Sequence, residues 1–256
     1  MRWQLSAAQW DVLTEWLGLE GYPAPLRVRS HGHTDVERAR VRAEVSAELG
    51  QLGLLRGGRV DADLEAALRL LHRPSAWVRS VWLPDNAADQ PVRVVAAQGG
   101  RAGVCAAQYP DPPGATMLEV IPAAALAAAV VAKLPPHPPG RSPAVTLSLE
   151  VNTAPDRGVL VTVPTARTSA ERSRAAAAAI LDQPHSRAGQ IAAVVRDPSG
   201  RVRRSDVLRW CDNPDGRYQV TISRGPRGPE SLVVAPGDPH RLGAGVQRLL
   251  ASVQPR

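Results

Sequence analysis

Apolar residues recur along this chain at two spacings, one typical of helices and one typical of strands. Ser6, Thr34 and Thr168 each stand three residues before Gln or Glu and open an apolar pattern of helical period, which predicts three capped helices. Asp61 caps a further helix that ends before Pro74, and another follows Asp238. In the helix after Thr34, the pattern places these residues inward: Val36, Ala43, Leu49 and Leu52.

Alternating apolar and polar residues predict strands between these helices. In the first part of the chain they cover 2–5, 76–83, 92–97, 102–109 and 117–121. Later strands are expected at 145–151, 159–163, 189–196, 206–211, 218–222 and 231–235. Asp-Pro-Ser-Gly at 197–200 and Asn-Pro-Asp-Gly at 213–216 have the composition of type I turns. Consecutive hairpins of this kind predict an antiparallel meander.

The order of elements is similar in the two parts of the chain. In each part a helix ends at a proline, four strands follow, and a second proline opens a last helix. Pro74, Gly100 and Pro122 recur as Pro184, Gly216 and Pro236, roughly 110–116 residues later. We therefore expect an α+β protein of two pseudo-repeated halves, each a mainly antiparallel four-stranded sheet with flanking helices. The halves are about 1–134 and 144–253 of one domain over 1–256, joined by an extended Pro-rich linker at 134–143.

The charge of the chain leaves a nucleic-acid function open without favouring it. The net charge is +7, and Lys133 is the only lysine among 31 basic residues. The arginines are scattered instead of gathered in one helix or tail, so solvated surface charge is the favoured interpretation. A richer segment at 196–204 is interpreted as a soluble edge hairpin, or alternatively as a basic finger for RNA or an acidic protein.

The residues that carry chemistry form no local constellation. His31 and His33 lie in a loop, and a solvated loop is the favoured interpretation over a metal site. No nucleophile elbow, phosphate loop, dinucleotide fingerprint or zinc-protease motif occurs, so we expect no enzyme and no cofactor, with catalysis by distant convergent residues left as an alternative. Cys105 and Cys211 are isolated, as is usual in a reducing cytosol. The longest apolar run, 120–134, contains a proline and is too short to cross a bilayer.

Several separate motifs, taken in order, resemble the EspG family. They are Leu5 to Leu17, Pro25-Leu26, Thr34 to Arg38, Gly53-Leu54, Gly189-Gln190-Ile191, Arg196-Asp197, Gly200-Arg201, Leu208-Arg209-Trp210-Cys211-Asp212 and Gly216-Arg217-Tyr218. The resemblance implies a cytoplasmic chaperone of type VII (ESX) secretion. Its protein partner would be a secretion substrate such as a PE–PPE-like helical heterodimer, bound without cofactor or membrane.

The resemblance also implies where a partner would bind. The family uses a sheet face, a strand loop of the first half and a C-terminal helical region. Here these correspond to the loop at 84–91, its neighbouring strands and the helix after Asp238. Trp77 and Trp82 lie an odd number of residues apart on one strand and must face opposite sides of the sheet. The candidate contact residues are Trp82, Asp85, Asn86, Asp89, Gln90, Arg201 and Arg203.

Overall fold

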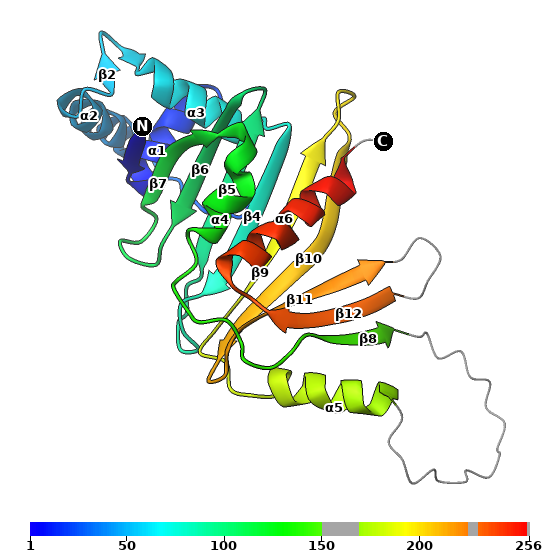
Figure 1. Ribbon diagram of the computed structural model, residues 1–256. Helices are drawn as coiled ribbons and strands as arrows, with labels where there is room; N and C mark the ends of the chain where they lie inside the picture. Colours follow the sequence, from blue (N-terminus) through cyan, green and yellow to red (C-terminus); the bar gives the residue numbers. More distant parts are fainter. Residues whose placement is uncertain (150–168, 225–229, 255–256) are drawn as a thin grey trace, which may run out of the picture.

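The computed structural model describes residues 1–149, 169–224 and 230–254, and its centre is one large sheet (Figure 1). Ten strands of the described chain join in the order β1-β7-β6-β5-β4-β9-β10-β11-β12-β8, and every neighbouring pair is antiparallel. The strands of the first half are β1 (Arg2–Leu5), β4 (Ala76–Leu83), β5 (Val92–Gly99), β6 (Ala102–Gln108) and β7 (Thr116–Pro122). Those of the second half are β8 (Val145–Leu149), β9 (Arg187–Arg196), β10 (Val202–Asn213), β11 (Gly216–Arg224) and β12 (Glu230–Pro236).

The antiparallel α+β fold is confirmed, and the two halves share one continuous sheet. Pairing of β4 with β9, from Ala76 opposite Val195 to Leu83 opposite Ala188, joins the two meanders. Each half also has five strands instead of four, because its first strand adds to the outer edge of its meander, β1 on β7 and β8 on β12. The strand order is therefore the same in both halves, counted outward from the centre. The boundaries of the halves stay a prediction.

Helices cover the two faces of the sheet in different places. On one face, α4 (Leu126–Val131, after the 3-10 turn Ala123–Ala125) and α6 (Pro239–Val253) pack on the central strands. On the other face, α1 (Ala7–Trp16), α2 (Asp35–Gln51) and α3 (Ala62–His72) cover the first half, and α5 (Ser169–Leu181) covers β8 and β11. A short hairpin of β2 (Leu55–Arg56) and β3 (Arg59–Val60) joins α2 to α3. Trp82 belongs to the α4/α6 side and Trp77 to the α1–α3 side, which confirms their opposite orientation.

The helix starts follow the local signals in the sequence. Complete capping boxes occur at Ser6 with Gln9 and at Thr34 with Glu37, and Asp61 and Asp238 accept hydrogen bonds from the first turns of α3 and α6. The strand predicted at 159–163 and the cap at position 168 lie outside the described residues.

The predicted inner face of α2 is wrong at three of its four positions. Leu49 is buried, together with Val45 one turn before it, whereas Val36 and Leu52 are exposed, as is Ala43. At 100° per residue, Val36 and Ala43 point about 140° and 120° away from Leu49. The helix therefore packs by a narrow stripe, and apolar residues outside the stripe face solvent.

The Pro-rich linker is held against the second half of the sheet. The Arg217 backbone N–H donates to the Pro138 carbonyl at 2.7 Å, and the Gly140 N–H donates to the Arg217 carbonyl at 2.8 Å. A parallel bridge also pairs Pro139 with Arg217. The linker is thus a packed segment at the start of β11 and not a free spacer.

Candidate partner-binding surface

One face at the centre of the sheet carries no helix of the described residues. The α4/α6 side of β4, β9 and β10 is covered, but no described helix packs on the opposite side of these strands between α1–α3 and α5, and this side lies behind them in Figure 1. We call its accessible side chains the open strip, which comprises Arg79, Val81, Leu83, Gln190, Val207 and Arg209. Leu83 is 38% exposed and Val207 36% exposed, so the open strip offers apolar contacts between basic and polar ones.

A shallow hollow of about 360 Å³ lies at one end of the open strip. Val81, Leu83, Gln190 and Arg209 surround it, and Gly189 lies among the residues that line it. A Cβ on Gly189 would stand 2.4 Å from Trp82 Cβ, so glycine is required for the tryptophan to pack beneath the strand. The absent side chain of Gly189 therefore makes room for Trp82 and Trp210 on the helix-covered side of the sheet, opposite the hollow.

Trp82 supports this surface from the other side of the sheet. Its side chain is 6% exposed and packs on Trp210, with ring centroids 6.0 Å apart. The indole N–H is buried and has no hydrogen-bond partner among the described residues. The Trp82 ring therefore packs in the core and does not reach the surface.

The loop between β4 and β5 places four candidate residues beside the hollow. Asp85, Asn86, Asp89 and Gln90 are all exposed. Asp85 accepts a hydrogen bond from the Ala87 N–H at 2.8 Å, and the Asn86 amide donates to the His185 carbonyl. The loop is therefore folded back on the start of β9 while its polar side chains stay accessible.

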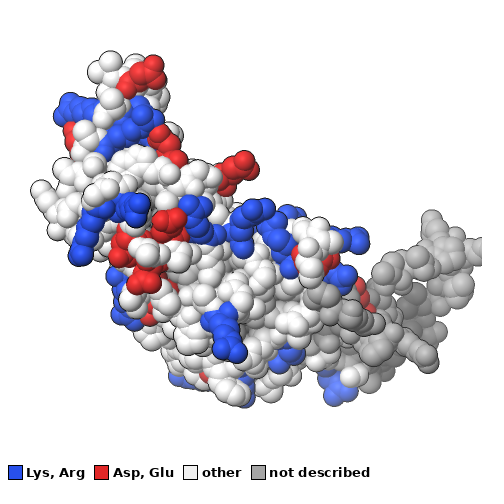
Figure 2. All heavy atoms as spheres, turned by 90° about the horizontal axis from the view of Figure 1, so that it is seen from above, with Lys and Arg blue, Asp and Glu red and all other residues white. Residues whose placement is uncertain are grey.

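Arg201 and Arg203 lie at the far end of the sheet from that loop. They follow the turn at 197–200, where the Gly200 N–H donates to the Asp197 carbonyl at 2.9 Å. The eight paired positions of β4 and β9 separate the two ends by roughly 25 Å. The structure thus does not bring these arginines together with the other candidates. Figure 2 shows basic side chains spread along one side of the molecule and interrupted by acidic and uncharged ones.

A second hollow, of about 770 Å³, lies on the same side beside β5. It is lined by Gln90 from the β4–β5 loop, by Arg93 of β5, and by Arg27, Arg29 and His31 from the segment before α2. Arg93 pairs with Val81 across β4 and β5, so the hollow adjoins the open strip. We call it the basic pocket. Sequence reasoning missed it because Arg27 and Arg93 are far apart in the chain and belong to no motif.

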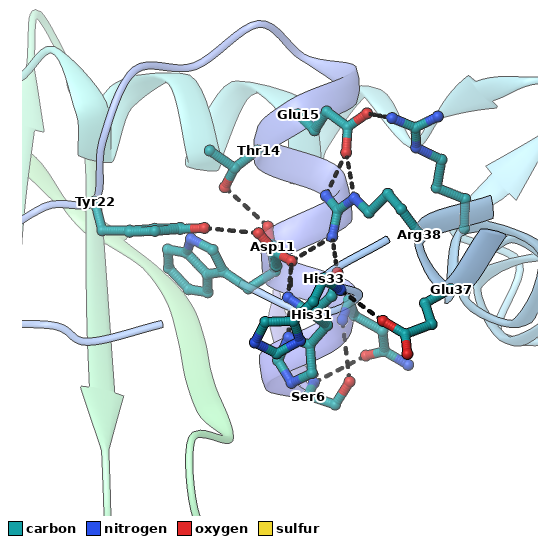
Figure 3. Close-up of polar contacts among 12 residues, drawn as sticks. Ser6, Asp11, Thr14, Glu15, Tyr22, His31, His33, Glu37 and Arg38 are labelled. Atoms are coloured by element: carbon teal, nitrogen blue, oxygen red, sulfur yellow. Dashed lines mark hydrogen bonds and ion pairs between the residues drawn. The ribbon is translucent and has the colours of Figure 1, made fainter. Parts of the chain in front are cut away.

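A polar network fixes the segment that carries Arg27 (Figure 3). Asp11 is 5% exposed and accepts hydrogen bonds from Arg38 Nη1 at 2.5 Å, the Tyr22 hydroxyl at 2.9 Å and the His31 backbone N–H at 2.9 Å. Arg38 also pairs with Glu15. One buried carboxylate on α1 therefore anchors both ends of the segment that forms a wall of the basic pocket.

The network predicts a pH-dependent contribution to stability. Burial by itself raises the pKa of Asp11, but the three hydrogen bonds outweigh it and hold the pKa below its usual range. The contribution is complete above the ordinary aspartate pKa of about 4 and is lost as the pH falls toward the folded value. Asp11→Asn should therefore show a shallower loss of stability than the wild type below about pH 4, measured by urea unfolding at several pH values. If the free energy of unfolding fell equally steeply with pH in the two proteins, the result would contradict this prediction.

The motif residues of the second half form a buried ion pair. Asp212 is 0% exposed, and Arg217 is 3% exposed. Arg217 Nε donates to Asp212 Oδ1 at 2.6 Å and Nη2 donates to Oδ2 at 2.8 Å, while the guanidinium lies 4.6 Å from the centre of the Trp210 ring. Arg217 Nη2 also donates to the Pro135 carbonyl at 2.8 Å. These residues hold the linker on the sheet and are closed to a partner.

Among the described residues, we find no cluster of metal ligands, and both cysteines have raised pKa values. No three His, Cys, Asp or Glu side chains in that part of the chain are grouped to hold a metal ion. His31 and His33 each donate a backbone N–H to a carboxylate. Burial raises the pKa of Cys105 to about 12 and, with a smaller effect of Asp212, that of Cys211 to about 11. None of the described helices combines the length and apolar character needed to cross a bilayer.

Comparisons with known proteins agree with the fold. The chain is similar in fold to the Mycobacterium tuberculosis type VII secretion system chaperone EspG5, solved in complex with a PE25–PPE41 dimer, with a TM-score of 0.71 and 16% identity over 100% of this chain and 97% of that one. No curated protein matches the sequence. The profile of the EspG family matches residues 6–248. The chain therefore belongs to the EspG family.

Proposed function

We propose that this chain is a cytoplasmic chaperone of type VII (ESX) secretion that binds a PE–PPE-like helical heterodimer, keeps it soluble and directs it to its secretion system. The observation that carries the proposal is the match to the EspG family over residues 6–248. The shared fold with a chaperone solved on a PE25–PPE41 dimer supports the same partner class. Binding of this kind needs no catalysis and no cofactor.

The open strip suits such a partner physically. Protein interfaces combine an apolar centre with a polar rim and bury about 800 Å² on each side. Val81, Leu83 and Val207 supply the apolar part, and the exposed β4–β5 loop borders it. A helical tip laid along β4 and β9 would contact both. We include the loop residues Asp85, Asn86, Asp89 and Gln90 in this surface.

Co-expression tests the proposal. The tagged chain should retain a PE–PPE-like pair from the same genome through affinity purification and size exclusion, and the pair should aggregate when expressed without it. Leu83→Asp and Val207→Asp together should abolish the complex, since charged side chains would be placed in its apolar centre. Val36→Asp is the matched control, because Val36 is equally apolar, 81% exposed and outside the open strip. Failure of every such pair to co-purify with the wild type would overturn the proposal.

A nucleic-acid partner remains the alternative. The exposed arginines at 201, 203 and 204 on the β9–β10 hairpin are the feature that favours it. Such binding would weaken steeply with salt and would be lost when these three arginines are replaced.

A further inference from the structure

The basic pocket brings together three arginines that have no acidic partner among the described residues, whereas its His31 lies 3.7 Å from the Asp11 carboxylate. Its lining includes Arg27, Arg29, Arg93 and His31 and contains no Asp or Glu. Within the described residues, no ion pair joins any of the three arginines to a carboxylate. Arg38, close by, is different, because Asp11 and Glu15 both pair with it. Arg38 is thus neutralised by two carboxylates, whereas the three arginines that line the pocket pair with no carboxylate of the described residues.

Arg27 is held in place by its backbone. Gln108, which is 3% exposed, accepts a hydrogen bond from the Arg27 N–H at 2.8 Å and donates to the Arg27 carbonyl at 3.0 Å. The same amide donates to Thr116 Oγ1 at 3.0 Å, which fixes its orientation on the sheet. A buried side chain is therefore committed to positioning this residue, whose guanidinium makes no hydrogen bond within the described chain.

Arg93 approaches the same space from β5. Its side chain is half-buried and makes one described hydrogen bond, a long one from Nη1 to the Pro91 carbonyl at 3.3 Å. Burial, and then the positive charge of Arg27, lower the pKa of Arg93. Two cations placed close together in a partly dry site repel each other, and this arrangement costs folding free energy. An anion between them would remove that cost.

We propose that Arg27 and Arg93 together bind a carboxylate from an acidic side chain of the protein that occupies the open strip. Arginine matches a carboxylate through two parallel N–H···O bonds, and such charge-assisted bonds are the stronger kind. Gln90, exposed at the rim, can donate a further hydrogen bond from its amide. Because Arg93 lies opposite Val81, the carboxylate would sit beside the apolar contacts and fix the register of the partner on the sheet. This inference rests on the proposed function.

The first experiment measures affinity for the purified PE–PPE-like pair. Arg27→Ala with Arg93→Ala should raise the Kd about tenfold or more and reduce its dependence on salt. Arg56→Ala with Arg101→Ala is the matched control, because both arginines are exposed and lie outside the pocket, and its Kd should stay within about twofold of wild type. Lysines at positions 27 and 93 should give an intermediate Kd, since they keep the charge but lose the planar fork.

A second experiment needs no partner. Citrate, a soluble polycarboxylate, should raise the melting temperature of the wild type more than that of the Arg27→Ala, Arg93→Ala variant. In buffer without citrate, this variant should melt no lower than the wild type, because repulsion is relieved; weaker partner binding then cannot be ascribed to misfolding. If the wild type binds no pair, the proposed function fails, and citrate still tests the pocket. If the wild type binds the pair and the variant binds it equally well, the carboxylate site is wrong.

Discussion

Arg217→Leu is expected to lower the free energy of unfolding by about 3–5 kcal/mol. The substitution leaves the Asp212 carboxylate fully buried and without its bidentate partner. Arg187 Nη1, 3.6 Å from Asp212 Oδ2, is within ion-pair range but beyond hydrogen-bond distance, so it offsets only part of the loss. The linker also loses the hydrogen bond from Arg217 to the Pro135 carbonyl. Since domains of this kind are stable by only about 5–15 kcal/mol, much of the variant should be unfolded or insoluble.

Two further variants distinguish the effect of an unpaired buried carboxylate from the effect of simply losing an arginine. Arg209→Leu, on the neighbouring strand and exposed, should change stability by no more than about 0.5 kcal/mol. Adding Asp212→Asn to Arg217→Leu should recover about 1–2 kcal/mol, because a buried amide costs less than a buried carboxylate. Urea unfolding followed by tryptophan fluorescence measures all three. A loss below about 1 kcal/mol in Arg217→Leu would show that Asp212 is not a buried anion.

Gly140→Ala is expected to cost about 3 kcal/mol, for a steric reason. A Cβ at this position would stand 2.1 Å from Tyr218 Cζ, at the ring face. The ring cannot yield, because it is 0% exposed and its hydroxyl bonds both Asp215 and the Ser142 N–H. The linker would have to leave β11 to accept one methyl group. Thermal unfolding should show a lower midpoint.

Gly50→Ala is the matched control for that prediction. Gly50 lies inside α2, and a Cβ there would meet no atom within 4 Å. Alanine in a helix interior is favoured over glycine by about 0.5–1 kcal/mol, so this variant should melt higher than wild type. A Gly140→Ala protein as stable as the Gly50→Ala protein would contradict the packing of the linker against Tyr218.

Elements specified by a few neighbouring residues could be predicted from the sequence. The capping boxes at Ser6 and Thr34 are local, and so is the turn at 213–216, where Asn213 Oδ1 accepts hydrogen bonds from the N–H groups of Asp215 and Gly216. The positions of the strands could be predicted as well, because the alternation of apolar and polar residues is also local and indicates which side chains face the core. The family resemblance rests partly on such residues and on the buried pair of Asp212 and Arg217.

The family resemblance indicated the loop at 84–91 and its neighbouring strands, but the open strip and the basic pocket could not be predicted, because they depend on which distant segments meet. The open strip exists only because β4 pairs with β9 while α1–α3 and α5 cover other strands. The basic pocket needs Gln108 of β6 to hold Arg27 beside Arg93. Trp82 shows the same limit: alternation gave its orientation relative to Trp77, but not that a helix layer covers it.

We propose that this chain binds a secretion substrate pair as a stable assembly. Light scattering on the co-purified material, eluted from a size-exclusion column at moderate salt, measures this directly. We predict a single species whose mass equals one 27.2 kDa chain plus one PE–PPE-like heterodimer. A chain that elutes alone at its own mass, with every such pair found in the aggregate fraction, would contradict the claim.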